Sequence, residues 1–260
     1  RRVEIRDVLL SIMDAEMRAD AAVQLMYASK YARIANGWKK WIGQIEGVQF
    51  SKGIDRKRKL EAEFTARIAA DANLWDKYSG LLNEIAVNKT QIAEGQLKRN
   101  EFIETIYYGM EWFSLMSKLQ RAKSEVDVDA ALVEFHQNYS RTVSEKTTAA
   151  MLSMALETFP DLLGEMDEAT FVSTVHNEID ALVELATTDE PIDLAIVAPT
   201  ASMFNTSAFQ AFYAVSPDNA LLQRAGELSA EYMRALMEVF PERNFYPDAN
   251  STLRVTYGKL

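Results

Sequence analysis

Several residue types are scarce in this chain of 260 residues, and each scarcity excludes a class of structure or site. The chain has no cysteine, which excludes disulfides, thiolate zinc sites and a cysteine nucleophile. Its ten glycines and six prolines are too few for a fold of many short strands joined by tight turns. Its two histidines, His136 and His176, do not stand three residues after a glutamate, as they would in a di-iron helical bundle. We therefore expect neither a metal nor a cofactor.

Local catalytic motifs are missing as well. The sequence has no His-Glu-x-x-His, no Gly-x-Ser-x-Gly, no Walker loop and no Gly-x-Gly-x-x-Gly. Each histidine falls in a helical stretch, which indicates a surface or partly buried side chain rather than a catalytic base. The residues alone thus predict a helical domain without catalytic residues of its own.

Positive charge is absent from a long stretch of the second half. The net charge is -10, and residues 147–223 contain twelve acidic residues but no lysine or arginine. A nucleic-acid partner is excluded for such a surface, because phosphates require basic neutralisation. The favoured interpretation is a solvated acidic face, and the alternative is attraction of cationic groups.

Apolar residues recur at helical spacing along most of the chain, which predicts an all-α multi-helix bundle. The two longest helices come first, and we expect them to pair as an antiparallel hairpin with the others packed around them. The predicted helices are 5–48 with a bend or close approach at Gly37, 54–94, 96–123 after a break near Gly95, 127–158 capped by Asp127, 167–187 opened by Asp167, and a last one capped by Ser216-Pro217 and ending near Phe240-Pro241.

The tail differs in kind from the rest. Residues 251–258 alternate and are rich in β-branched and aromatic residues, which predicts a short strand. Such a strand has no partner in a helical chain, and its backbone groups need pairing elsewhere. We therefore expect a helical domain over 1–246, with 247–260 beginning a sheet domain. The opening Arg1-Arg2, inside a predicted helix and without a leading methionine or signal peptide, is also expected of a fragment.

Two segments carry a resemblance to a known family. They are Tyr-Ala-Ser-Lys-Tyr-Ala-Arg-Ile-Ala-Asn-Gly-Trp-Lys-Lys-Trp-Ile-Gly at 27–43 and Phe-Tyr-Pro-Asp-Ala-Asn-Ser-Thr-Leu-Arg-Val-Thr-Tyr-Gly-Lys at 245–259. Both resemble the bacterial serine dipeptidyl-peptidase 7/11 family. The resemblance implies a helical cap inserted into a chymotrypsin-like double β-barrel, which carries the Ser-His-Asp triad and releases dipeptides from free amino ends. The fragment would then be inactive alone.

The resemblance also implies partners and a location. The expected partners are the barrel of the same chain and a peptide with a free amino end. No membrane span is expected. The longer enzyme could form a homodimer, which the resemblance allows. The enzyme would be exported by a bacterium, to the periplasm or the cell surface.

One site residue is implied by the resemblance, namely Asn36, whose family counterpart helps to hold the terminal ammonium of the substrate. An ammonium has three donors and no acceptor, so an amide oxygen suits it. The alternative is a helix-kink residue beside Gly37 that bonds to nearby backbone. We expect Trp38 and Trp41 to be core or wall residues. Tyr27 and Tyr31 either pack or line the cleft, and packing is favoured.

A second hypothesis makes the chain a helical interaction scaffold unrelated to peptidases. Its long amphipathic helices would then bind partner helices. The tail strand would be disordered or would extend the sheet of a partner.

Overall fold

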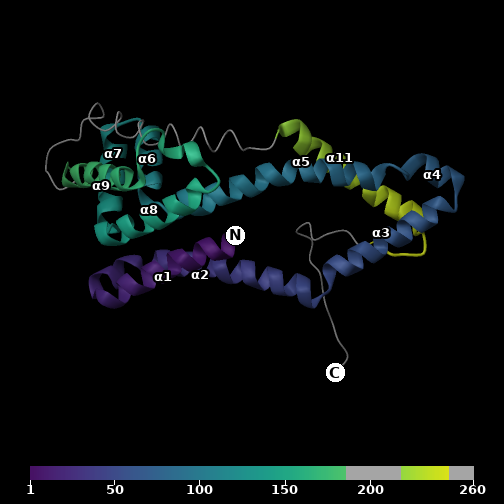
Figure 1. The fold of residues 1–260 in the computed structure, drawn as a ribbon, viewed down its shortest axis with the longest axis horizontal. Helices are drawn as coiled ribbons and strands as arrows, with labels where there is room; N and C mark the ends of the chain where they lie inside the picture. The colour runs from purple at the N-terminus through teal and green to yellow at the C-terminus, as the bar shows by residue number, and fades with distance from the viewer. Residues whose placement is uncertain (186–217, 246–260) are drawn as a thin grey trace, which may run out of the picture. The chain divides into compact units, whose positions relative to one another are not determined.

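The computed structural model describes residues 1–185 and 218–245 (Figure 1). These residues form helices joined by short turns, with no strand among them, which confirms the predicted all-α class. The strand predicted at 251–258, and with it the predicted domain boundary after residue 246, lies outside the described residues.

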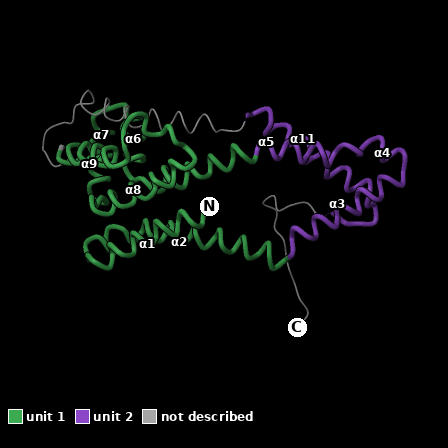
Figure 2. The backbone as a smooth tube through the Cα atoms, viewed as in Figure 1, with its two compact units in different colours: residues 1–51, 93–217 green, residues 52–92, 218–260 purple. Residues whose placement is uncertain are grey.

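The chain forms two compact units, shown in different colours in Figure 2. Unit 1 comprises residues 1–51 and 93–217, and unit 2 comprises 52–92 and 218–260. Helix α5 (Leu81–Phe102) contributes residues to both. The other elements of unit 1 are α1 (Arg2–Ala19), α2 (Ala21–Phe50), the π-helix η1 (Ile103–Tyr107), α6 (Glu111–Arg121), α7 (Glu125–Gln137), α8 (Arg141–Leu156), the 3-10 helix η2 (Pro160–Leu163) and α9 (Glu168–Leu185); those of unit 2 are α3 (Gly53–Ala69), α4 (Ala72–Tyr78) and α11 (Asn219–Val239).

The single helix predicted over 5–48 is wrong, because the chain reverses at Asp20. That residue has extended backbone angles, φ -141° and ψ 120°, and its carboxylate accepts a hydrogen bond from Ala22 N at 2.7 Å. A side-chain oxygen in this position satisfies a free N–H at the start of a helix. Helices α1 and α2 therefore pack side by side as a hairpin inside the segment predicted to be one helix.

The predicted helix over 54–94 is likewise interrupted, and the break expected near Gly95 is absent. Asp71 caps α4 by accepting hydrogen bonds from Asn73 N at 2.8 Å and Leu74 N at 3.2 Å. Helix α5 then continues through Gly95, because one glycine costs only about 1 kcal/mol in a helix interior. Helices α1 and α2 form a hairpin within the first of the two segments that were predicted to pair.

Helix starts were predicted with mixed success. The cap predicted at Asp127 is wrong, because Ser124 occupies that position and Asp127 reaches back to Lys123 N at 3.0 Å. The hydroxyl of Ser124 in turn accepts from Asp127 N at 3.2 Å, so both side chains bond to backbone at the start of α7. Asp167 does open α9, accepting from Thr170 N at 2.9 Å. Asp218 caps the last helix, and Ser216-Pro217 lies outside the described residues.

That last helix, α11, ends as predicted, at Val239 just before Phe240. The predicted helix over 127–158 is interrupted between α7 and α8, at residues 138–140. The predicted helix over 96–123 is divided among the end of α5, η1 and α6.

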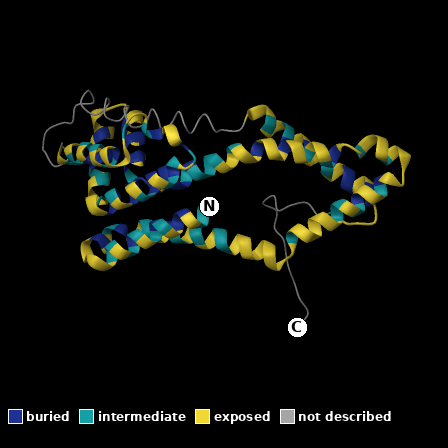
Figure 3. Ribbon diagram, viewed as in Figure 1, coloured by how far each residue is buried: buried dark blue, intermediate teal, exposed yellow. Residues whose placement is uncertain are grey.

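Each unit has its own apolar core (Figure 3). In unit 1, α1 and α2 contribute to a cluster that continues through α6, α8 and α9. In unit 2, Phe64 of α3 is fully buried and its ring meets Tyr232 of α11 edge-on, with centroids 6.1 Å apart. Helices of the described ranges are too short or too polar to cross a bilayer.

Replacing Phe64 by alanine should destabilise unit 2 by about 3–5 kcal/mol, since a fully buried ring leaves a cavity. Urea denaturation followed by far-UV circular dichroism measures this loss. Phe50→Ala is the matched control, because Phe50 is 94% exposed and its loss should change stability by about 0.5 kcal/mol or less. Equal effects of the two changes would contradict the assigned core.

Candidate functional site

Asn36 lies in the middle of α2 with its side chain exposed. Its side-chain amide makes no hydrogen bond to another described residue, and α2 runs without interruption from Ala21 to Phe50. The local bond to backbone that the kink interpretation includes is therefore absent among the described residues, and the helix is not interrupted at Asn36. The amide of Asn36 is free to meet a ligand from outside the described chain.

The neighbouring Gly37 is required by a close approach of Arg6 from α1. A Cβ atom built on Gly37 would lie 1.8 Å from Arg6 Nη1 and 2.6 Å from its Cζ. Arg6 Nη1 donates a hydrogen bond to the carbonyl oxygen of Ile34 at 3.0 Å. Of the two roles predicted for Gly37, the close approach is confirmed.

Arg6 is held there by Glu104, in the π-helix η1. Its Nε donates to Glu104 Oε2 at 2.7 Å, and Arg2 Nε lies 3.2 Å from Glu104 Oε1. Glu104 is 1% exposed and Arg6 8% exposed. Buried charges persist only when paired, and removing one partner of such a pair typically costs about 3–5 kcal/mol. This cluster fixes α1, α2 and η1 around the segment that carries Asn36.

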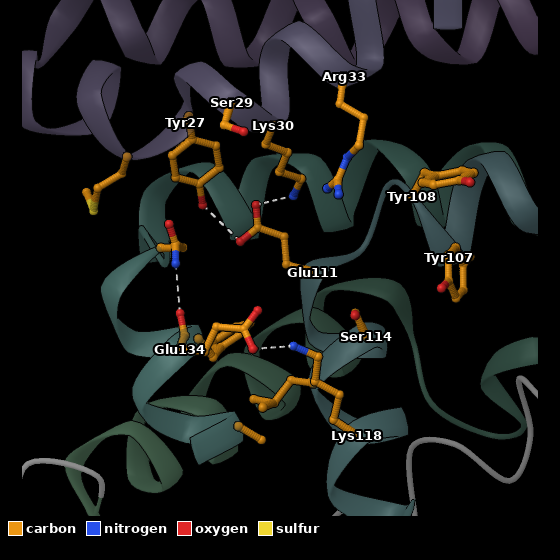
Figure 4. A pocket seen from close by; sticks show the side chains of 15 residues that line it. Tyr27, Ser29, Lys30, Arg33, Tyr107, Tyr108, Glu111, Ser114, Lys118 and Glu134 are labelled. Carbon is orange, nitrogen blue, oxygen red and sulfur yellow. Dashed lines mark hydrogen bonds and ion pairs between the residues drawn. The ribbon is translucent and has the colours of Figure 1, made fainter. Parts of the chain in front are cut away.

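A pocket of about 580 Å³ opens beside α2 (Figure 4). Its walls come from α2, the end of η1, α6 and α7, all within unit 1. The lining residues are Met26, Tyr27, Ser29, Lys30, Arg33, Tyr107, Tyr108, Glu111, Ser114, Leu115, Lys118, Ala131, Glu134, Phe135 and Asn138. A volume of this size suits a small molecule or a short peptide.

One wall of this pocket is fixed by Glu111, whose carboxylate accepts from two residues of α2. Tyr27 donates to it at 2.9 Å, and Lys30 forms an ion pair with it. Tyr27 is 1% exposed, and burial together with the charge of Glu111 raises the pKa of its hydroxyl well above the usual value. Ser140 N donates to the same hydroxyl at 3.2 Å. Tyr27 is therefore a neutral packed residue, as predicted, which also lines the pocket.

Asn36 and the pocket share one side of α2. Asn36 follows Arg33 by three residues, and residues three apart are neighbours on a helix surface. Arg33 lines the pocket and Asn36 does not. The candidate site therefore consists of an exposed amide one turn beyond a preformed polar pocket.

The remaining aromatic residues of this segment are partly buried, which fits the prediction of core or wall residues at Trp38 and Trp41 and of packing at Tyr31. The ring of Trp41 lies under the guanidinium of Arg2, with 4.3 Å between its centroid and Cζ. Trp38 is half-buried, and Tyr31 packs against the core of unit 1. None of these three lines the pocket.

The two histidines provide no catalytic constellation. His136 is exposed. His176 is fully buried, so the expectation of a surface or partly buried side chain is wrong for it. Its Nδ1 donates to Val172 O at 2.7 Å, which leaves Nε2 to accept from the buried Ser144 at 3.0 Å. A carbonyl takes the place that a carboxylate holds in a triad, and the serine is closed to substrate. Residues 1–185 and 218–245 also hold no cluster of His, Asp or Glu that could bind a metal.

Parts of the acidic segment 147–223 are neutralised from outside it. Glu157 lies 2.7 Å from Arg1, and Asp180 forms an ion pair with Arg141. Both pairs are partly exposed, and such pairs are worth about 1 kcal/mol or less. For these residues the solvated-face interpretation fits the structure.

Sequence reasoning missed the charged residues that build the site. Arg6 and Glu104 are 98 residues apart, and Lys30 and Glu111 are 81 apart. Each looks like an ordinary surface charge on an amphipathic helix, so no local pattern marks it. The glycine at Gly37 was the one available signal, because a glycine inside a helix indicates either weakness or a close approach.

Comparison with known proteins gives one consistent result. The family described as Peptidase S46 matches residues 1–260. The chain is 29% identical to an Asp/Glu-specific dipeptidyl-peptidase of Flavobacterium psychrophilum, over 100% of the chain and 40% of the relative. It is 24% identical to dipeptidyl-peptidase 7 of Porphyromonas endodontalis, over 100% of the chain and 34% of the relative. The chain thus spans 40% or less of these relatives' length.

Two glycines of α2 provide a matched test of the contact with Arg6. Gly37→Ala should destabilise unit 1 by about 1–3 kcal/mol, because the new methyl group displaces a guanidinium that Glu104 and Ile34 hold in place. Gly43→Ala, with nothing within 4 Å, should instead stabilise it by about 1 kcal/mol. Chemical denaturation of both variants measures the difference, and a stabilising Gly37→Ala would contradict the close approach.

Replacing Glu104 by glutamine should cost about 3–5 kcal/mol, since it leaves the positive charges of Arg6 and Arg2 without their buried partner. Glu46→Gln removes the same charge from an exposed position of α2 and should change stability by about 0.5 kcal/mol or less. The two denaturation midpoints are compared. Similar midpoints would show that the buried pair does not hold the helices together.

Proposed function

The chain belongs to the peptidase S46 family, and from this premise we propose that it is the helical cap of a serine-type dipeptidyl-peptidase. The cap covers the cleft of a catalytic double β-barrel elsewhere in the same protein, which releases dipeptides from the free amino ends of peptides. Relatives named as dipeptidyl-peptidases, with which the chain aligns over its whole length, support this proposal. In it the nucleophile and base come from the barrel, and the cap by itself cleaves nothing.

In this proposal Asn36 receives the terminal ammonium of the substrate. The observation that carries this role is its exposed, unbonded amide on an uninterrupted helix. Its Oδ1 accepts one of the three ammonium hydrogens without adding charge. Because Arg6 and Glu104 fix this part of α2, the amide is presented at a defined place, which lowers the entropy lost on binding.

The enzyme works outside the cytoplasm of a bacterium, in the periplasm or at the cell surface, where peptides with free amino ends are its substrates. The resemblance of residues 27–43 and 245–259 to an exported family supports this location. The residue preferred at the cleavage position belongs to the barrel, and the proposal covers dipeptide release only.

Asn36→Ala in the complete enzyme should lower kcat/KM for dipeptidyl reporter substrates about 10- to 100-fold. A hydrogen bond to a charged group is worth about 1.5–3 kcal/mol, and about 1.4 kcal/mol corresponds to tenfold. Asn73→Ala, at an exposed position of α4, is the control and should leave kcat/KM unchanged.

A reporter with an acetylated amino end separates recognition from general damage. It has no ammonium to lose, so its slow cleavage should be equal in wild type and Asn36→Ala. Unchanged kcat/KM for the free-amino reporter in Asn36→Ala would remove this residue from the substrate site.

A further inference from the structure

The pocket beside α2 carries one positive charge that no other described residue neutralises. Five charged side chains line it, and four of them pair: Lys30 with Glu111, and Lys118 with Glu134 at 2.7 Å. The fifth, Arg33, has no ion pair or hydrogen bond with any other described residue. Figure 4 shows its side chain extending from α2 into the pocket. The charged side chains of the lining are thus three positive and two negative. A ligand with one negative charge would balance them.

The rest of the lining offers partners for a peptide rather than for a bare anion. The hydroxyls of Ser29 and Ser114 have no hydrogen bond with another described residue. Tyr107 and Tyr108, 50% and 37% exposed, present their rings at one end. Hydroxyls can donate to or accept from a peptide group, and rings pack against its side chains.

The pocket is also preformed. Tyr27, Lys30 and Glu111 are tied together across the gap between α2 and α6. A ligand therefore does not need to order this wall when it binds, and this raises its affinity.

We propose that this pocket binds the carboxylate end of a short peptide, of about dipeptide size, with Arg33 as its counter-ion. The planar guanidinium can donate two parallel hydrogen bonds to a carboxylate. Because Glu111 and Glu134 are already paired with lysines, the lining leaves one positive charge, which a single carboxylate matches and a dianion such as phosphate exceeds. The inference follows from the pocket lining alone and does not rest on the proposed peptidase activity.

The test is calorimetric titration of the complete protein with Ala-Ala, with Ala-Ala amide and with inorganic phosphate. Ala-Ala should bind with a Kd at least about tenfold below those of the amide and of phosphate. Arg33→Gln should weaken Ala-Ala binding at least about tenfold, because it removes the charge that meets the carboxylate. Arg56→Gln, the same change at an exposed position outside the pocket, should leave the Kd unchanged.

Three results would overturn the proposal: absence of Ala-Ala binding, equal binding of peptide and amide, or unchanged binding in Arg33→Gln. Ala-Ala with an acetylated amino end separates this pocket from the substrate site, because it keeps the carboxylate and has no ammonium for Asn36. It should bind with the same dependence on Arg33 as Ala-Ala, and a loss of binding on acetylation would place the dipeptide at Asn36 and also overturn the proposal. The proposed peptidase role is tested separately, by kcat/KM of the complete enzyme for the dipeptidyl reporter substrates.

Discussion

Arg6 and Glu104 are both buried, and the position of α2 depends on their ion pair. The guanidinium of Arg6 can reach Glu104 and the carbonyl of Ile34 only because Gly37 has no side chain in its path. If a side chain at position 37 blocked this contact, a charged group would be buried without a partner. The free-energy cost of that would be far above the cost of one glycine in a helix. The pair therefore couples the hairpin of α1 and α2 to the π-helix that follows α5.

This coupling explains why a recognition surface can sit on a helix rather than on loops. Asn36 precedes Gly37 by one residue and follows Arg33 by three, so the contact of Arg6 with Ile34 and Gly37 fixes the backbone within about one turn of both outward-facing groups. A second tie, from Tyr27 and Lys30 to Glu111, holds the other end of the same face against α6. Side chains on a helix held at two places have little freedom to lose when a ligand binds.

The spacing of apolar residues predicted the helical class, because the buried face of a helix takes every third or fourth residue. The same spacing did not locate the helix ends. Asp20 reverses the chain between two apolar stripes that keep the helical spacing on either side of it, so only its cap contact with Ala22 reveals the turn. Gly95 looked like a break and is tolerated, because one glycine is a weak penalty. Asn36 was reached through resemblance, whereas Arg6 and Glu104, 98 residues apart, give no local signal at all.

The buried polar groups in the described part of unit 1 hold helices in place and form no catalytic arrangement. His176 and Ser144 make the same contact as a base and its nucleophile, yet both are buried and the second ring nitrogen is bound to a carbonyl. The one serine–histidine contact among the described residues is thus closed to substrate. Membership of that family also removes the hypothesis of a scaffold unrelated to peptidases. The described part of unit 1 presents outward an amide acceptor at Asn36 and, in a separate pocket, the guanidinium of Arg33; the first is suited to an ammonium and the second to a carboxylate.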